Sequence, residues 1–215
     1  MNTPKTVKAL EDLGREQLSP SFFMRDFLYS EISQIEGIPN IPDNPDLAIE
    51  AGRHLCEQVL EPIQARFGRI TIRSAYRSSA VNSIGCRKKY NCARNENNFA
   101  RHIWDVPDAD GSMGAMACIV LPRYLAYYER TRDWQALAWW IHDNVPGYSS
   151  MYFFPRLAAF NIGWKQTPEK TIHSYAPPKG CLTKPGMPNH DGSHSAEYET
   201  MLEEMHHEGS LQKTL

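Results

Sequence analysis

A histidine followed closely by three aspartates is the first group of side chains in this chain that could carry chemistry. His102 begins the segment, and Asp105, Asp108 and Asp110 follow it in the sequence "HIWDVPDAD". Imidazole nitrogen and carboxylate oxygen are both zinc ligands in proteins. The segment therefore raises the hypothesis of a metal-dependent hydrolytic site, with a structural hydrogen-bonding role for His102 as the alternative.

The same aspartates also raise the hypothesis of a calcium site, because calcium binds carboxylate oxygens. An EF-hand loop would need an aspartate two residues before Asp108, and a glutamate at the position that Ala117 occupies. The segment is more typical of a turn whose carboxylates accept hydrogen bonds from backbone N–H groups.

Two other places in the chain carry histidines with a neighbouring carboxylate. His142 lies in "WWIHDN", where the pattern favours the surface of an amphipathic helix over a metal ligand. His190, Asp191 and His194 lie in "NHDGSHS", where Gly192 interrupts any helix that would bring the two histidines together. A solvated loop is the favoured interpretation of that stretch.

The elements that must position these residues are a long helix and several strands. Apolar residues at helical spacing predict a helix over 46–67, with Pro62 bending it near its end. The alternating stretch "RITIRSAY" predicts a strand, and "SSAVNSI" predicts the capped start of a helix directly after it. Residues 85–101 predict a long loop, and residues 134–143 predict an amphipathic helix.

Apolar segments in the second half of the chain predict the remaining strands. They are "MGAMACIV", "SSMYFFPRLAAFNIGWK" and "KTIHSYAP". The expected fold class is α+β, with an antiparallel sheet flanked by the helices at 46–67 and 134–143. We expect the functional site in a cleft on the open face of that sheet.

Composition limits the partners and the compartment. The 23 basic and 25 acidic side chains leave a formal net charge of −2, so no broad positive field favours nucleic acid. No stretch approaches the roughly 20 apolar residues of a membrane span, and the first residues lack the apolar core of a signal peptide. We therefore expect a chain that is made in the cytoplasm. The five cysteines form no CxxC pair and are expected to be thiols.

The chain divides into a main domain and two extensions. Residues 1–18 are charged and weakly periodic, which is typical of an arm or short helix that settles on another surface. Residues 19–176 hold the predicted elements of the main domain. Residues 177–215 shift to glycine, proline and charged residues before a short predicted helix from Ser195.

The order of several short motifs resembles one enzyme family. The motifs are "FMRDFLYSE", "GIPNIP", "VLEPIQARFG" and "SAYRSSAVN", followed by a polar loop, a histidine and apolar strands that end in tryptophan. In this order they resemble the zinc D-alanyl-D-alanine peptidases of bacterial cell walls, which share their fold with the hedgehog signalling domain. The resemblance covers residues 20–175, and the ordered combination is more specific than any single motif.

The resemblance implies a substrate site around the Tyr-Arg motif. By position, Arg77 would hold a carboxylate or carbonyl of the substrate beside the metal, for which a planar fork of donors is suited. The alternative is that Arg77 ties its loop to the core. Tyr76 and Asn82 belong to the same motif, with core packing the favoured role of Tyr76 and a cap or loop brace that of Asn82.

The resemblance also implies a zinc site, from which this chain departs. Family members use a histidine, an aspartate within "His-x-x-Gly-x-Ala-x-Asp" and a later histidine. His102 matches the first ligand, whereas the aspartate position is occupied by Cys118 and the last histidine position by Asn161. Thiolate can bind zinc, but an amide is a poor ligand. Asp105 or Asp110 could instead supply the carboxylate.

His142 is the remaining candidate for the last ligand, although no glutamate stands three residues before it as a general base. If active, the chain would be a zinc metallopeptidase that hydrolyses D-amino-acid peptide bonds in the stem peptides of peptidoglycan. The alternative function is a non-catalytic structural or wall-binding component of a phage-like particle. In that case, the arm at 1–18 and the tail after 176 would contact other proteins of the assembly.

Overall fold

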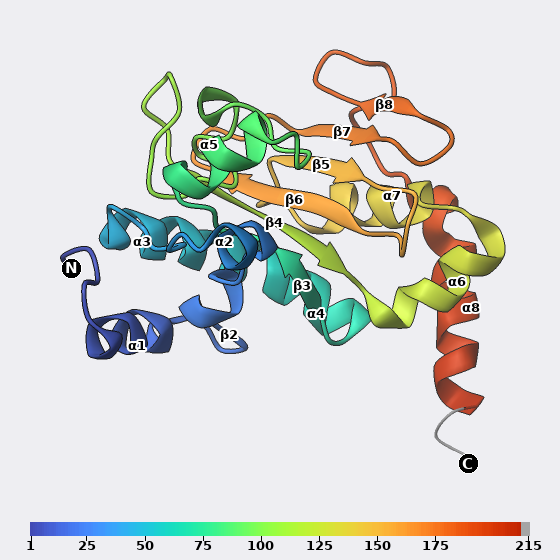
Figure 1. Cartoon of the computed structure of the whole chain (residues 1–215). Coiled ribbons are helices and arrows are strands. Elements are labelled where there is room, and N and C mark those ends of the chain that lie inside the picture. The colour runs from blue at the N-terminus through green and yellow to red at the C-terminus, as the bar shows by residue number, and fades with distance from the viewer. Residues whose placement is uncertain (212–215) are drawn as a thin grey trace.

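A six-stranded sheet in the order β3-β4-β6-β5-β7-β8 forms the centre of the computed structural model, which describes residues 1–211 (Figure 1). Its strands are β3 (Thr71–Ser74), β4 (Gly114–Val120), β5 (Ser150–Phe153), β6 (Phe160–Lys165), β7 (Thr171–Ser174) and β8 (Gly180–Thr183). A separate two-stranded hairpin joins β1 (Gln17–Ser19) to β2 (Phe22–Phe23). The expected α+β class is confirmed.

The sheet is mixed, so the expectation of an antiparallel sheet was wrong for one strand pair. β5 pairs with β7 in parallel, while every other pair in the sheet is antiparallel. After β6, the chain turns back and adds β7 to the free edge of β5, so β7 runs in the same direction as β5. Alternation along a strand predicts which side chains are buried but carries no information about strand direction.

The helices expected at 46–67, after Ser78 and at 134–143 are all present. The helices are α1 (Val7–Arg15), α2 (Glu31–Glu36), α3 (Pro45–Leu55), α4 (Glu61–Phe67), α5 (Ser79–Arg87), α6 (Pro122–Thr131), α7 (Gln135–Asn144) and α8 (Ser195–Leu211). The helix expected over 46–67 is α3, a π-helical turn at Cys56–Leu60 and α4 in succession. The turn comes directly before Pro62, whose missing N–H interrupts the regular ladder of hydrogen bonds.

One face of the sheet is buried against helices, and the opposite face carries the polar residues. Ala115, Ala117 and Ile119 of β4 are each 0% exposed, and α3 packs against β4 and β6. The alternate residue Cys118 points to the other face, and the register places Asn161 of β6 directly beside it. Tyr152 of β5 follows Asn161 in the same row. Strand alternation therefore gives the sheet one face for the core and one for a site.

Both ends of the described chain pack on the main domain. In α1, Leu13 is 0% exposed, and the helix contacts the 3₁₀ turn at Met24–Phe27. At the other end, α8 lies against α6 and α7 and buries Met201 and Met205 (Figure 1). Among the residues that the structure describes, none of the helices combines the length and apolar character needed to cross a membrane.

Candidate functional site

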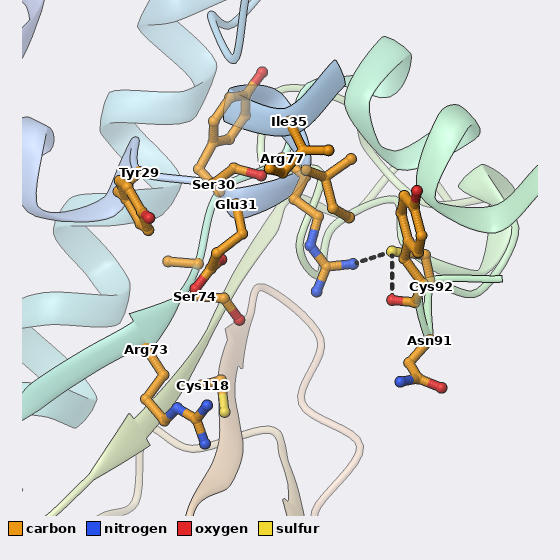
Figure 2. A pocket seen from close by; sticks show the side chains of 14 residues that line it. Tyr29, Ser30, Glu31, Ile35, Arg73, Ser74, Arg77, Asn91, Cys92 and Cys118 are labelled. Atoms are coloured by element: carbon orange, nitrogen blue, oxygen red, sulfur yellow. Dashed lines mark hydrogen bonds between the residues drawn. The ribbon is translucent and has the colours of Figure 1, made fainter. Parts of the chain in front are cut away.

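A cavity of about 650 Å³ opens beside the C-terminal end of β3, next to Cys118 of β4. Its walls come from α2 and the two residues before it, from β3 and the loop that follows, from the loop at 90–92, and from Cys118 of β4 (Figure 2). Three large side chains of this wall are well exposed: Tyr29 at 58%, Ile35 at 79% and Tyr90 at 44%. Exposed apolar residues around a polar floor are typical of a binding pocket.

Arg77 lies at the junction between β3 and α5, where the sequence predicted a strand running into a capped helix. Ser78 caps α5 by accepting a hydrogen bond from Val81 N at 3.2 Å. The Arg77 backbone N–H donates to the carbonyl of His102 at 2.7 Å. Its Nη1 donates to Oδ1 of Asn82 and to Sγ of Cys92, each at 3.2 Å. The chain therefore fixes one edge of the guanidinium beside the cavity.

The remaining donors of Arg77 have no protein partner among the described residues. Arg73 adds a second guanidinium to the cavity wall and lies next to Cys118 in Figure 2. Glu31 is the one carboxylate among the described lining residues, so the charged side chains there carry a net positive charge. Two guanidinium groups on one wall are suited to holding a carboxylate or phosphate.

His102 lies beneath the cavity rather than on its wall. It is 4% exposed, and its Nδ1 lies 2.8 Å from the carbonyl oxygen of Ala75. That contact requires a proton on Nδ1, so Nε2 carries the lone pair in the neutral ring. Burial, with a smaller contribution from the Arg77 charge, lowers the pKa of His102 to about 3, and a side-chain hydrogen bond with Asn161 opposes the shift. His102 is therefore neutral at pH 7.

The structure brings His102 together with the two residues that occupy the other ligand positions of the resembled family. Asn161 interacts with the His102 ring, and Cys118 pairs with Asn161 in the β4–β6 register. Burial raises the pKa of the Cys118 thiol to about 11, although the nearby guanidiniums of Arg73 and Arg77 lower it in part. Cys118 is therefore a neutral thiol at pH 7. The grouping follows the alignment made from the sequence.

These three side chains do not fit a catalytic zinc ion. Such a site uses three nitrogen, sulfur or oxygen ligands and leaves one position open to solvent. Here one imidazole and one thiol are joined by an amide, which is a poor zinc ligand. His102 is 4% exposed, and neither it nor Asn161 is among the described residues that line the cavity.

The other carboxylates proposed from the sequence lie in other surroundings. Asp105 Oδ2 accepts hydrogen bonds from the backbone N–H groups of Asp43 at 2.7 Å and Asn44 at 3.4 Å, so it fastens the start of α3. Burial raises the pKa of Asp105. Asp110 is exposed, and its backbone N–H donates to Asp108 Oδ1 at 3.0 Å. The interpretation of this segment as a carboxylate-capped turn agrees with that contact.

Tyr76 and Asn82 both have structural surroundings. Tyr76 is 0% exposed and packs edge-on against Trp104, as core packing predicted. Two buried side-chain atoms of the described residues lack a well-formed hydrogen bond. They are Oη of Tyr76 and Oδ1 of Asp105, which face each other. Burial, and then the Asp105 charge, raise the pKa of Tyr76. Asn82 braces the loop after α5 by donating to the carbonyl of Ala93 at 3.0 Å.

His142 belongs to a separate cluster on α7. Its Nδ1 lies within hydrogen-bonding distance of Tyr148 Oη, and its Nε2 donates to the carbonyl of His190 at 2.7 Å. Burial lowers the pKa of His142, so its ring is neutral at pH 7. His190 and His194 join it, although the sequence favoured a solvated loop for them. A pairing between segments about 50 residues apart leaves no local signal in the sequence.

The sequence carries no signal for the mouth of the cavity. Its residues come from three segments of the chain, and each looks like an ordinary surface residue in its own stretch: Tyr29, Glu31 and Ile35, then Arg73, then Tyr90. Only the fold shows that they surround one space.

Comparison of the chain with protein-family models, with curated proteins and with solved structures finds no match. The resemblance to the cell-wall peptidases therefore stays a prediction that rests on the motifs and on the grouping of His102, Cys118 and Asn161.

Proposed function

We propose that this chain is a peptidase-like protein that binds carboxylate-bearing peptides, of the kind found in peptidoglycan stems, without hydrolysing them through zinc. The observation that carries this proposal is the contrast within one site. Arg73 and Arg77 offer two guanidiniums to a large cavity, whereas the neighbouring ligand positions hold a sealed imidazole, a thiol and an amide.

The cavity has the features that a peptide ligand requires. Charge-assisted hydrogen bonds from a guanidinium fork hold a carboxylate in a fixed orientation, and Arg77 is already braced by Asn82 and Cys92. The exposed rings of Tyr29 and Tyr90 and the side chain of Ile35 supply apolar contact area. A stem peptide combines terminal carboxylates with short apolar side chains, so it matches both features.

The donor set argues against zinc hydrolysis. A zinc hydrolase needs an open coordination position for water and a general base near it. The described residues around His102 provide neither a carboxylate ligand nor a second imidazole. Asp105 is hydrogen-bonded to the backbone at the start of α3, and His142 is hydrogen-bonded within the separate cluster on α7. The site therefore supports recognition of the peptide rather than cleavage.

The experiment is calorimetric titration of the protein with a stem pentapeptide and with the same peptide amidated at its C-terminus. Hydrogen bonds to charged groups contribute about 1.5–3 kcal/mol, so Arg73→Ala should weaken the pentapeptide about tenfold to a hundredfold. Arg77→Lys keeps the charge but loses the fork, and a similar loss is expected.

Arg69→Ala is the matched control, because Arg69 is also exposed but does not line the cavity. It should bind like the wild type, and the amidated peptide should bind weakly to every protein. Equal binding of both peptides, or equal binding by Arg73→Ala and Arg69→Ala, would remove the basis of the proposal.

A further inference from the structure

The segment between β8 and α8 contacts α7 through the side chains of His190 and His194. None of the residues 184–194 is buried, so this stretch contributes nothing to the hydrophobic core. It nevertheless carries His190 and His194 onto the surface of α7, where their rings lie 5.0 Å and 5.3 Å from the ring of His142. The His194 ring also stacks on Trp139 at 4.0 Å with an angle of 6° between the planes. The contact of this segment with α7 therefore depends on its two histidines.

Three potential metal ligands meet at this contact. One nitrogen each from His142 and His194 and one oxygen from Asp143 all lie within 4.8 Å of one another. The side chains of His194 and Asp143 are only 10% and 11% exposed. Zinc bonds of about 2.0–2.2 Å in tetrahedral geometry bring ligand atoms to roughly 3.5 Å apart, so small rotations of these side chains reach that spacing.

The hydrogen bonds around His194 explain why a cation suits this place. Its Nε2 lies 3.0 Å from the carbonyl oxygen of Asn189, and its Nδ1 lies 2.7 Å from Oδ1 of Asp143. Both ring nitrogens thus face acceptors, while a neutral imidazole has only one proton to donate. A second proton on the ring satisfies both acceptors, and a zinc ion takes its place if Nδ1 and the carboxylate oxygen move from 2.7 Å to roughly 3.5 Å apart. With a metal there, Nε2–H would still donate to the Asn189 carbonyl, the usual outer contact of a metal-bound histidine.

The other two side chains are also oriented toward this role. Asp143 Oδ2 accepts hydrogen bonds from the backbone N–H of His194 at 2.7 Å and from Tyr198 Oη at 3.3 Å, so its Oδ1 is left facing the cluster. His142 is held by Tyr148 and by the His190 carbonyl, and it exchanges one of these contacts for the metal.

We propose that His142, Asp143 and His194 bind one zinc ion that fastens residues 184–194 and the start of α8 to α7. The fourth position falls to water or to the nearby ring of His190. This ion has a structural role, since it joins to α7 a segment of which no residue is buried. The site is separate from the one around His102, and the inference does not depend on the proposed peptide binding.

The test is a titration of metal-stripped protein with Zn²⁺ in competition with a chromophoric chelator. One zinc per chain is expected, and Asp143→Asn and His194→Ala should each weaken its binding at least tenfold. His207→Ala is the matched control, because His207 is an exposed histidine of the same C-terminal region and is not a ligand. His102→Asn and Cys118→Ser should bind zinc like the wild type.

Hydrogen exchange of the amides at 184–194 gives a second readout that also shows whether each variant is folded. Zn²⁺ should slow this exchange in the wild type and in His207→Ala, and should leave it unchanged in His194→Ala. The inference is overturned if the wild type binds no zinc at micromolar concentration, or if the zinc survives in His194→Ala. Loss of zinc in His102→Asn alone would instead assign the metal to the peptidase-type position.

Discussion

Acidification should reveal His102 as a buried neutral imidazole. The pKa of His102 is about 3 in the folded chain, against 6.5 for an unperturbed histidine, chiefly because burial excludes the charged form. The unfolded chain therefore takes up this proton first. The stability that comes from the neutral ring is fully present above pH 6.5, and it is lost progressively as the pH falls from 6.5 toward 3.

The magnitude follows from the two pKa values. Each pKa unit corresponds to about 1.4 kcal/mol, so the whole window corresponds to at most about 5 kcal/mol. Between pH 7 and pH 5, where most carboxylates are still ionised, the expected loss of unfolding free energy from His102 is about 2 kcal/mol. A typical domain has only about 5–15 kcal/mol in total, so the effect is large enough to measure.

The assay is urea unfolding at several pH values between 7 and 4, on the wild type and on His102→Asn. An asparagine can still donate to the Ala75 carbonyl but does not titrate, so it is the matched control. The variant should be less stable at pH 7, yet it should lose about 2 kcal/mol less on acidification to pH 5. Carboxylates such as Glu169, whose pKa is lowered by Arg101 and Lys165, affect both proteins equally.

Parallel loss of stability in the two proteins would refute the argument for a sealed imidazole. A direct check is the ring resonance of His102, which should not titrate above pH 5. Titration near pH 6.5 would mean that water reaches the ring, and an open metal ligand would then become tenable.

Three further changes test the packing and the alignment behind the site. Gly114→Ala should lower the free energy of unfolding by several kcal/mol, because a Cβ at this position would lie 2.3 Å from a backbone carbonyl oxygen. Denaturant unfolding measures this loss, and wild-type stability of the variant would contradict the packing of β4. Asp105→Ala should lower the free energy of unfolding by about 1–3 kcal/mol, because it leaves the N–H groups at the start of α3 unpaired. Asp110 is exposed, so Asp110→Ala should have almost no effect. Equal effects of the two changes would mean that the hydrogen bonds to Asp105 do not hold the start of α3. The double change Cys118→Asp with Asn161→His should add one zinc per chain over the wild type in elemental analysis, and no gain would break the match to the peptidase ligand positions.

The sequence could predict those helices, strands and caps that are set by residues close together in the chain. The cap at Ser78 and the strand before it identified the position of Arg77, and the apolar spacing of 46–67 identified the helices that cover the sheet. The β4–β6 register also places Cys118 beside Asn161, while their match to ligand positions stays a prediction. Each of these signals lies within one continuous stretch of chain.

Features that depend on distant segments could not be predicted in this way. The parallel pairing of β7 with β5 is set by how the chain returns after β6. The ring stacking of His194 on Trp139 joins residues that the sequence separates by four strands and a turn-rich tail. The expectation that the extensions contact other proteins of an assembly stays a prediction, and residues 212–215 of the tail lie outside the described residues.

The most direct test of the central claim is mass analysis of a stem pentapeptide after incubation with the protein and Zn²⁺, under conditions where calorimetry shows saturation. We expect the peptide to bind, to require Arg73 and Arg77 for binding, and to be recovered intact. Release of D-alanine by the wild type, but not by His102→Ala, would show instead that the protein is a zinc peptidase.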